Sequence, residues 1–102
     1  HSFTPVLGNQ NRKSEIGILF DPSRAQEKEL AQLWKKRILA HADVKVRFNY
    51  PYRGKADGFT TYLRKCFPFN YAGIELEVRN DVIKQLTPAI SESVVELKAL
   101  FS

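Results

Sequence analysis

The strongest constraint on the fold is a short apolar run that passes directly into a helix start. Glu15 to Phe20 has the pattern of a buried strand, because large apolar residues lie on both sides of Gly17. Asp21-Pro22-Ser23 ends this strand, and Ser23 with Gln26 has the spacing of a capping box that opens a helix. A strand that leads at once into a helix is the repeating unit of α/β domains. This segment therefore predicts an α/β fold.

The rest of the chain continues the alternation of strand and helix patterns. Leu30, Leu33, Trp34 and Ile38 recur at helical spacing and extend the first helix to about Ala40. The further expected elements are a half-exposed strand at Val44 to Phe48, a helix from about Asp57 to Phe67, a strand at Ala72 to Arg79, and a helix from Thr87 to about Phe101. This order predicts a three-layer α/β arrangement with a mostly parallel sheet.

Length and composition limit the class of protein. The 102 residues have room for one small domain, and 43% apolar with 26% charged residues is typical of an ordinary globular protein. No apolar run approaches the roughly 20 residues that a membrane span needs, so we expect no membrane partner. The single cysteine, Cys66, rules out an internal disulfide and fits a reducing compartment. We therefore expect a cytoplasmic protein.

The N-terminal sequence indicates that the chain belongs to something larger. The chain contains no methionine and starts at His1, inside what reads as a motif. We therefore expect residues 1–102 to be the C-terminal part of one domain whose N-terminal part is missing. The isolated chain would then be inactive, because part of its active site would be absent.

The net charge of +5 raises the question of a nucleic-acid partner. Lys35-Lys36-Arg37 is the one dense basic cluster, and on a helix these side chains fan around the axis instead of forming a stripe. We therefore expect a solvated basic surface and no nucleic-acid partner. The alternative, a basic nucleic-acid-binding fragment, predicts retention on heparin with a steep salt dependence.

The third expected strand carries the sharpest local signal. Glu75, Glu77 and Arg79 point to one face of this strand, and apolar residues point to the other. Charged side chains on an interior strand are costly unless they line a site, so this face is either functional or exposed to water. Glu77 and Arg79 lie at the carboxyl end, where sites form in open α/β sheets. The two glutamates, about 7 Å apart along a strand, also leave a glycosidase pair as a rival interpretation.

Four blocks of the sequence, in order, resemble the N-formylglutamate amidohydrolase family. The first is HSFTPVL at residues 1–7, followed by Arg12, which is similar to the family's histidine segment. The second is NYPYRG at residues 49–54, which resembles the family loop Asn-Glu-Pro-Tyr-x-Gly. GFT at residues 58–60 resembles the Gly-Tyr-Thr that follows this loop. EVRNDVI at residues 77–83 resembles the family strand end Glu-Ile-Arg-Asn-Asp-Leu-Ile.

This resemblance implies a fold, a cofactor and a reaction. The family is similar to zinc carboxypeptidases, so it implies a zinc-exopeptidase-like domain that binds zinc through three protein ligands. His1 corresponds to the later histidine ligand, and the earlier His-x-x-Glu pair has no counterpart in the chain. Glu77 corresponds to the catalytic glutamate, the general base. The implied reaction is hydrolysis of the amide bond of an N-formyl or N-acyl amino acid, such as N-formylglutamate, by metal-activated water.

The substrate of this family carries free carboxylates, so an arginine is expected to bind one of them through a bidentate pair. Arg12 and Arg53 are the first candidates. Arg79 comes third, because it lies close to two carboxylates with which it can pair instead. Asn49 and Tyr52 lie in the same loop as Arg53 and complete the predicted substrate-binding set. A non-catalytic anion-binding module of the same fold is the alternative function.

Overall fold

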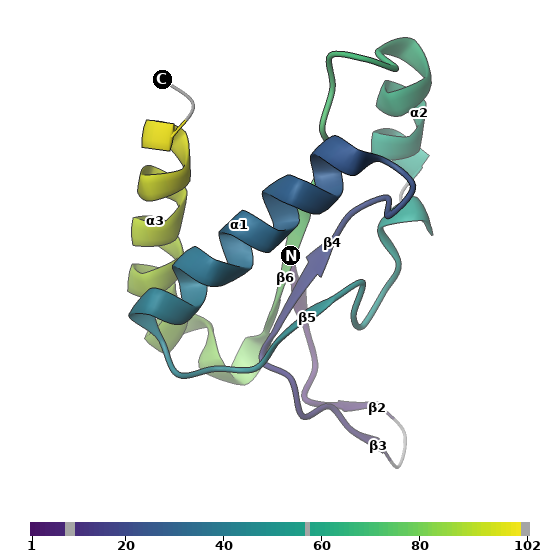
Figure 1. Cartoon of the computed structure of the whole chain (residues 1–102). Coiled ribbons are helices and arrows are strands. Elements are labelled where there is room, and N and C mark those ends of the chain that lie inside the picture. The colour runs from purple at the N-terminus through teal and green to yellow at the C-terminus, as the bar shows by residue number, and fades with distance from the viewer. Residues whose placement is uncertain (8–9, 57, 101–102) are drawn as a thin grey trace.

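The structure is a computed structural model, and it describes residues 1–7, 10–56 and 58–100. Its centre is a four-stranded sheet in the order β1, β6, β4, β5 (Figure 1). These strands span Ser2–Phe3 (β1), Ile16–Leu19 (β4), Val46–Phe48 (β5) and Glu75–Arg79 (β6). A small antiparallel pair, β2 (Val6–Leu7) with β3 (Gln10–Asn11), lies apart from this sheet.

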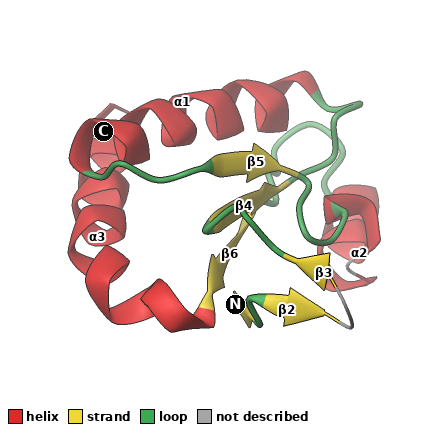
Figure 2. Cartoon of the chain, turned by 90° about the horizontal axis from the view of Figure 1, so that it is seen from below, coloured by secondary structure: helices red, strands yellow, loops and turns green. Residues whose placement is uncertain are grey.

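The helices of the described ranges are α1 (Ala25–His41), α2 (Gly58–Cys66) and α3 (Ile83–Leu100), with short 3-10 turns at Gly54–Ala56 (η1) and Asn80–Val82 (η2). α1 and α3 lie on the same side of the sheet, and α2 stands apart from them (Figure 2). No helix in the described part of the chain has the length and apolar character to cross a membrane. The expected helix start at Asp57 and the expected end at Phe101 lie outside the described residues.

The α/β class is confirmed, and the sheet is mixed. β1 runs parallel to β6 and β4 runs parallel to β5, but β4 and β6 are antiparallel. The amino end of β4 therefore lies beside the carboxyl end of β6, where Ile16 pairs with Val78. The loop that follows β5 consequently leaves the sheet at the opposite end from Arg79.

Two helix starts differ from their expected positions. Ser23 does not form a capping box, because its backbone N–H and its hydroxyl both donate to Asp21 Oδ1, at 3.0 and 2.7 Å. α1 instead begins at Ala25, without a side-chain cap from Arg24. α3 begins at Ile83, and the Thr87 hydroxyl donates to the Ile83 carbonyl from inside the helix. Local capping patterns therefore predicted that a helix forms, but not where it begins.

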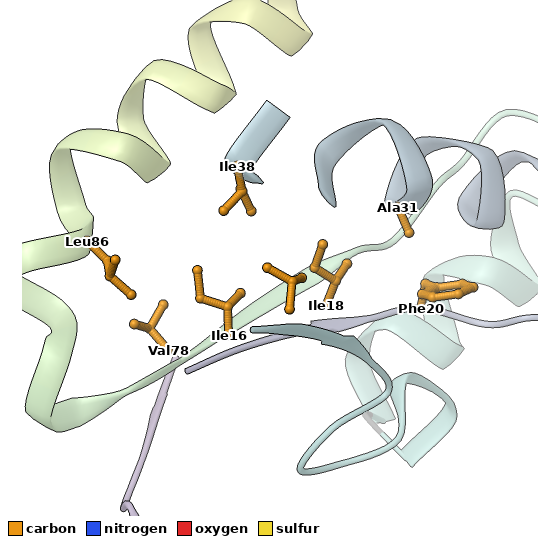
Figure 3. Packing of buried hydrophobic residues seen from close by; sticks show 8 residues of the cluster. Ile16, Ile18, Phe20, Ala31, Ile38, Val78 and Leu86 are labelled. Atoms are coloured by element: carbon orange, nitrogen blue, oxygen red, sulfur yellow. The ribbon is translucent and has the colours of Figure 1, made fainter. Parts of the chain in front are cut away.

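The hydrophobic core lies between the sheet and the helix pair (Figure 3). Its buried residues come from β4, β5 and β6, from α1 and from the start of α3: Ile16, Ile18, Phe20, Ala31, Ile38, Val46, Val78 and Leu86. Trp34 packs against this cluster from the predicted apolar face of α1. Because α1 and α3 both pack on this face, the described helices leave the opposite face of the sheet to loops and polar side chains.

A buried ion pair joins α1, α2 and the segment before β6. Glu27 of α1 is fully buried and pairs with Arg64 of α2 through two nitrogen–oxygen contacts of 2.9 Å. The backbone N–H groups of Asp21 and Gly73 also donate to the Glu27 carboxylate, at 2.8 and 3.0 Å. Arg64 in turn donates to the Gly73 carbonyl at 2.9 Å. One carboxylate therefore fixes three segments that are far apart in sequence.

The hydrogen bonds to Glu27 outweigh the cost of burying it. Burial by itself would raise the pKa of Glu27, but the donors from Arg64, Asp21 and Gly73 hold that pKa below its usual value. The carboxylate is therefore ionised in the folded state. Arg24 Nε also lies 3.1 Å from Glu27 Oε2, without a hydrogen bond from that nitrogen. Loss of Arg64 would therefore leave the buried carboxylate with a weaker ionic partner, which costs more than the loss of an exposed pair.

We predict that Arg64→Met lowers the free energy of unfolding by about 2–4 kcal/mol, because the buried Glu27 carboxylate then loses two charge-assisted hydrogen bonds and keeps Arg24 as its ionic partner, at 3.1 Å. Urea denaturation followed by circular dichroism measures this loss. Lys65→Met is the matched control, since Lys65 is the exposed neighbour on α2, and it should change stability by less than about 0.5 kcal/mol. Glu27→Met combined with Arg64→Met should recover part of the loss; equal stability of Arg64→Met and the wild type would contradict a structural role for the pair.

Candidate active site

The face of the sheet opposite α1 and α3 carries the acidic residues of β6. Leu76 and Val78 pack on the core, so the alternating residues Glu75 and Glu77 point to the other face, as the sequence pattern predicts. Gly17 of β4 pairs with Glu77 and therefore shares this face with it. The predicted two-sided character of this strand is confirmed.

Glu77 is a buried carboxylate without a full set of partners. Only 5% of Glu77 is exposed, and its Oε2 atom has no hydrogen-bond partner among the described residues. Burial raises the pKa of Glu77, while the positive charges of the His1 amino group and of Arg12 act in the opposite direction. A carboxylate with a raised pKa and an unpartnered oxygen atom is a better proton acceptor than an exposed carboxylate.

His1 lies beside these carboxylates because it extends the pairing of β1 with β6. Its backbone nitrogen donates to the Leu76 carbonyl and its carbonyl accepts from the Val78 N–H, both at 3.0 Å. The His1 imidazole Nε2 lies 3.5 Å from Glu75 Oε2. The structure therefore brings the predicted zinc ligand and the predicted general base to the same face of the sheet.

The described residues do not assemble a complete metal site. No group of three or more histidine, cysteine, aspartate or glutamate side chains that could hold a metal ion occurs among them. A catalytic zinc ion needs three protein ligands, and His1 supplies one imidazole to this face. Among the described residues, the predicted zinc ligand His1 therefore lies on this face without two further ligands beside it.

Arg12 is held near Glu77 by aromatic rings. The segment after β3 turns back, so that the Arg12 N–H bonds the Pro5 carbonyl at 2.7 Å. The guanidinium carbon lies 5.5 Å from the ring centre of Phe3 and 5.8 Å from that of Tyr52. No carboxylate of the described residues lies within ion-pair distance of it, although it donates one hydrogen bond to a backbone carbonyl. Arg12 is therefore placed to bind an anion beside the carboxylates.

The other two candidate arginines lie in different surroundings. Arg79 donates to Asp81 Oδ1 at 2.7 Å and to the Arg12 carbonyl at 2.8 Å. Its guanidinium therefore joins the end of β6 to the segment that carries Arg12. Arg53 is exposed and lines a separate pocket of about 260 Å³ with Phe20 and Lys55. Glu77 is not part of that lining.

The loop that follows β5 is closed by Asn49. Its backbone has a φ of 51°, in the left-handed region, which asparagine tolerates better than most residues. Its side-chain oxygen accepts from the N–H groups of Phe20 and Gly54, at 3.1 and 3.0 Å. This oxygen is therefore engaged in shaping the loop, while Tyr52 from the same loop contacts Arg12.

Gly17 is a site residue that the sequence reasoning did not single out. A Cβ atom at Gly17 would lie 1.5 Å from the Tyr50 carbonyl oxygen, so the loop rests directly on the strand backbone. The Tyr50 ring then packs edge-on against Phe3, with 6.1 Å between ring centres, and Arg47 stacks on it at 4.6 Å. A glycine inside an apolar strand is the available signal, because it often marks such a close backbone approach.

Comparison with known proteins finds a likeness among solved structures. No protein-family model matches the chain, and no curated protein matches it. Among solved structures, the chain is similar to the crystal structure of gene product Atu2144 from Agrobacterium tumefaciens, with 28% sequence identity and a TM-score of 0.69. The similarity covers 100% of this chain and 41% of the other. The chain therefore spans less than half the length of the structure it resembles.

We predict that Glu77→Gln stabilises the chain at neutral pH. Because burial raises the pKa of Glu77, the folded state binds this proton more tightly than the unfolded state does. Stability is therefore greatest below the unfolded pKa and decreases as pH rises through the folded pKa. Glutamine removes this decrease, so the variant and the wild type should have similar stability at acidic pH and diverge as pH rises toward neutrality.

Urea denaturation at a series of pH values, followed by Trp34 fluorescence, tests this prediction. Glu29→Gln is the control, because it removes an exposed carboxylate from α1. A Glu77→Gln variant that is less stable than the wild type at neutral pH would contradict the prediction, because it would show that the folded state stabilises the ionised carboxylate.

Proposed function

We propose that this chain is the C-terminal part of a cytoplasmic zinc-dependent amidohydrolase of the zinc-exopeptidase-like fold, which hydrolyses N-formyl or N-acyl amino acids such as N-formylglutamate. The observation that carries the proposal is the buried carboxylate of Glu77, with an unpartnered oxygen, on the same sheet face as His1 and Arg12. These three residues belong to the blocks that resemble the amidohydrolase family. The 41% coverage of the solved relative is consistent with a longer domain.

In this proposal, Glu77 moves the proton. Its Oε2 atom accepts a proton from water as that water attacks the amide carbonyl, and the same carboxyl group then gives the proton to the leaving amine. A raised pKa makes the first transfer easier, because the protonated form of the carboxyl group is less costly in a buried position. Zinc, when bound, would supply a Lewis acid that lowers the pKa of water to about 7. His1 would provide one of its ligands, and residues outside this chain would provide the others.

Arg12 is the residue we assign to the substrate carboxylate. Its guanidinium is flanked by Phe3 and Tyr52, which limits its motion without neutralising its charge. A planar fork held in this way favours the two-point binding of a carboxylate. Arg79 then acts as a positioning residue, since it donates to the Arg12 carbonyl.

A second candidate, the anion-binding module without catalysis, rests on Arg12 alone. Its guanidinium is flanked by aromatic rings, and no carboxylate of the described residues lies within ion-pair distance of it. The two candidates differ in one measurable respect. The amidohydrolase binds one zinc ion in the longer protein and turns over N-acyl amino acids, and the module does neither.

We predict that Glu77→Gln, made in the longer protein, keeps the zinc content and lowers kcat about 10²–10⁴-fold, the usual cost of losing a general base. Glu75→Gln is the matched control on the same face and should reduce kcat far less. Steady-state kinetics with N-formylglutamate, together with metal analysis, tests both. Equal losses for the two variants would contradict a single general base and favour a pair of carboxylates. Absence of both zinc and turnover in the unmodified protein would favour the anion-binding module.

We also predict that Arg12→Lys raises KM for N-acyl amino acids about tenfold or more, because lysine does not reproduce the fork. Arg53→Lys is the matched control, since Arg53 lines a separate pocket, and its effect should be small. The comparison uses the free acid and its amide as substrates. If Arg12 binds the substrate carboxylate, the wild type and Arg12→Lys should have the same KM for the amide, which lacks that carboxylate. If Arg12→Lys instead raises KM equally for the acid and for the amide, Arg12 has a structural role.

A further inference from the structure

A basic groove lies at the amino end of β5, the strand at the opposite edge of the sheet from β1. The groove has a volume of about 530 Å³. It is lined by two residues before β4, two residues of α1, two residues before β5 and two residues of β5: Lys13, Ser14, Lys35, Leu39, Val44, Lys45, Val46 and Arg47. We propose that this groove binds an acidic, extended peptide segment, which adds a strand to the sheet beside β5.

The edge of β5 has backbone groups available for such pairing. In the described part of the sheet, β5 pairs with β4 alone. The Lys45 carbonyl accepts from Ile16 at 3.2 Å and the Asn49 N–H donates to Ile18 at 2.8 Å, so these alternate residues face β4. The backbone groups of Val46 and Phe48 therefore face outward, as the alternation of a parallel ladder requires.

The lining indicates that the groove reaches this backbone edge at the start of β5. Val46 and Arg47 both contribute to it, although successive side chains of a strand point to opposite faces. A groove over one face would involve alternate residues only. Leu39 and Val44 supply apolar surface that can receive alternate side chains of an added strand, as in known cases of strand addition.

The charge of the groove selects the chemistry of its partner. Of the described residues, four cations and no acidic residue line it, and none of the described carboxylates lies within ion-pair distance of these cations. Lys35 lies 5.1 Å from the ring centre of Phe48, and Arg47 lies 4.6 Å from that of Tyr50. Aromatic rings hold these cations without neutralising them. An acidic segment would complete both the charge and the backbone hydrogen bonds.

Two other occupants fit less well. A second copy of the chain would bring lysines against lysines, which is the usual way in which edge strands avoid self-association. Single-stranded nucleic acid binds through phosphates and through stacking of bases on aromatic side chains. Among the described residues, no aromatic side chain belongs to the groove lining. The free strand edge therefore favours a peptide.

The test measures binding of a fluorescent peptide that alternates glutamate and valine to the 102-residue chain. Fluorescence anisotropy should show saturable binding that weakens with salt, and amide NMR shifts should centre on Val46 and Phe48. Lys13→Glu combined with Lys45→Glu should weaken binding about tenfold or more, because two favourable pairs become repulsive. Lys84→Glu, an exposed lysine at the start of α3, is the charge-matched control and should have little effect.

Two further probes separate strand addition from general attraction between charges. The same peptide with N-methyl groups on alternate residues keeps its charge but loses the donors that pair with β5, so it should bind at least about tenfold more weakly. Equal binding of the methylated peptide, or tighter binding of a single-stranded oligonucleotide, overturns the proposal. So does an unchanged affinity in the charge-reversed variant. If that variant does not fold, the methylated peptide and the NMR shifts of the wild-type chain decide the question.

Discussion

The buried pair of Glu27 and Arg64 is the interaction on which the rest of the structure depends. Glu27 accepts hydrogen bonds from the backbone after β4, from α2 and from Gly73. Gly73 lies two residues before β6, so the carboxylate helps to set where that strand enters the sheet. The position of Glu77 on β6 follows from this. A polar contact at one end of the molecule therefore supports a carboxylate at the centre of its sheet.

The two faces of β6 differ in their contacts. Leu76 and Val78 face α1 and α3 and pack in the core, so the alternating residues Glu75 and Glu77 lie on the face of the candidate site. Burial of Glu77 on the second face does not come from a helix. It comes from β1, from the segment that carries Arg12, and from the loop that rests on Gly17. The candidate site therefore depends on where the loops pack. Gly17 is part of it because a side chain there would displace the loop that carries Tyr50.

Local patterns in the sequence predicted the strands β4 and β6, but they did not predict how these strands pair. The apolar run of β4 and the alternation along β6 are properties of neighbouring residues, so both could be predicted from the sequence. The antiparallel pairing of β4 with β6 depends on contacts between distant segments, and no local pattern specifies it.

The same distinction applies within the candidate site. The sequence predicted Glu77, Arg12 and His1, and the structure places them on one face. The sequence did not predict that Asn49 would be used to close its loop, because its partners, Phe20 and Gly54, are set by the chain path. The pair of Glu27 and Arg64 was missed for the same reason, since these residues lie 37 positions apart.

The long-range character of the Glu77 site has a consequence for how it forms. The backbone bond between His1 and Leu76 joins residues 75 positions apart, and the bond from Arg79 to the Arg12 carbonyl spans 67 positions. Contacts of this separation are slow to form, and during synthesis they must wait until β6 has been made. Until then, Glu77 is an ordinary hydrated carboxylate. Its proton affinity is therefore acquired late, as a property of the completed sheet, and a local opening of β1 would be enough to remove it.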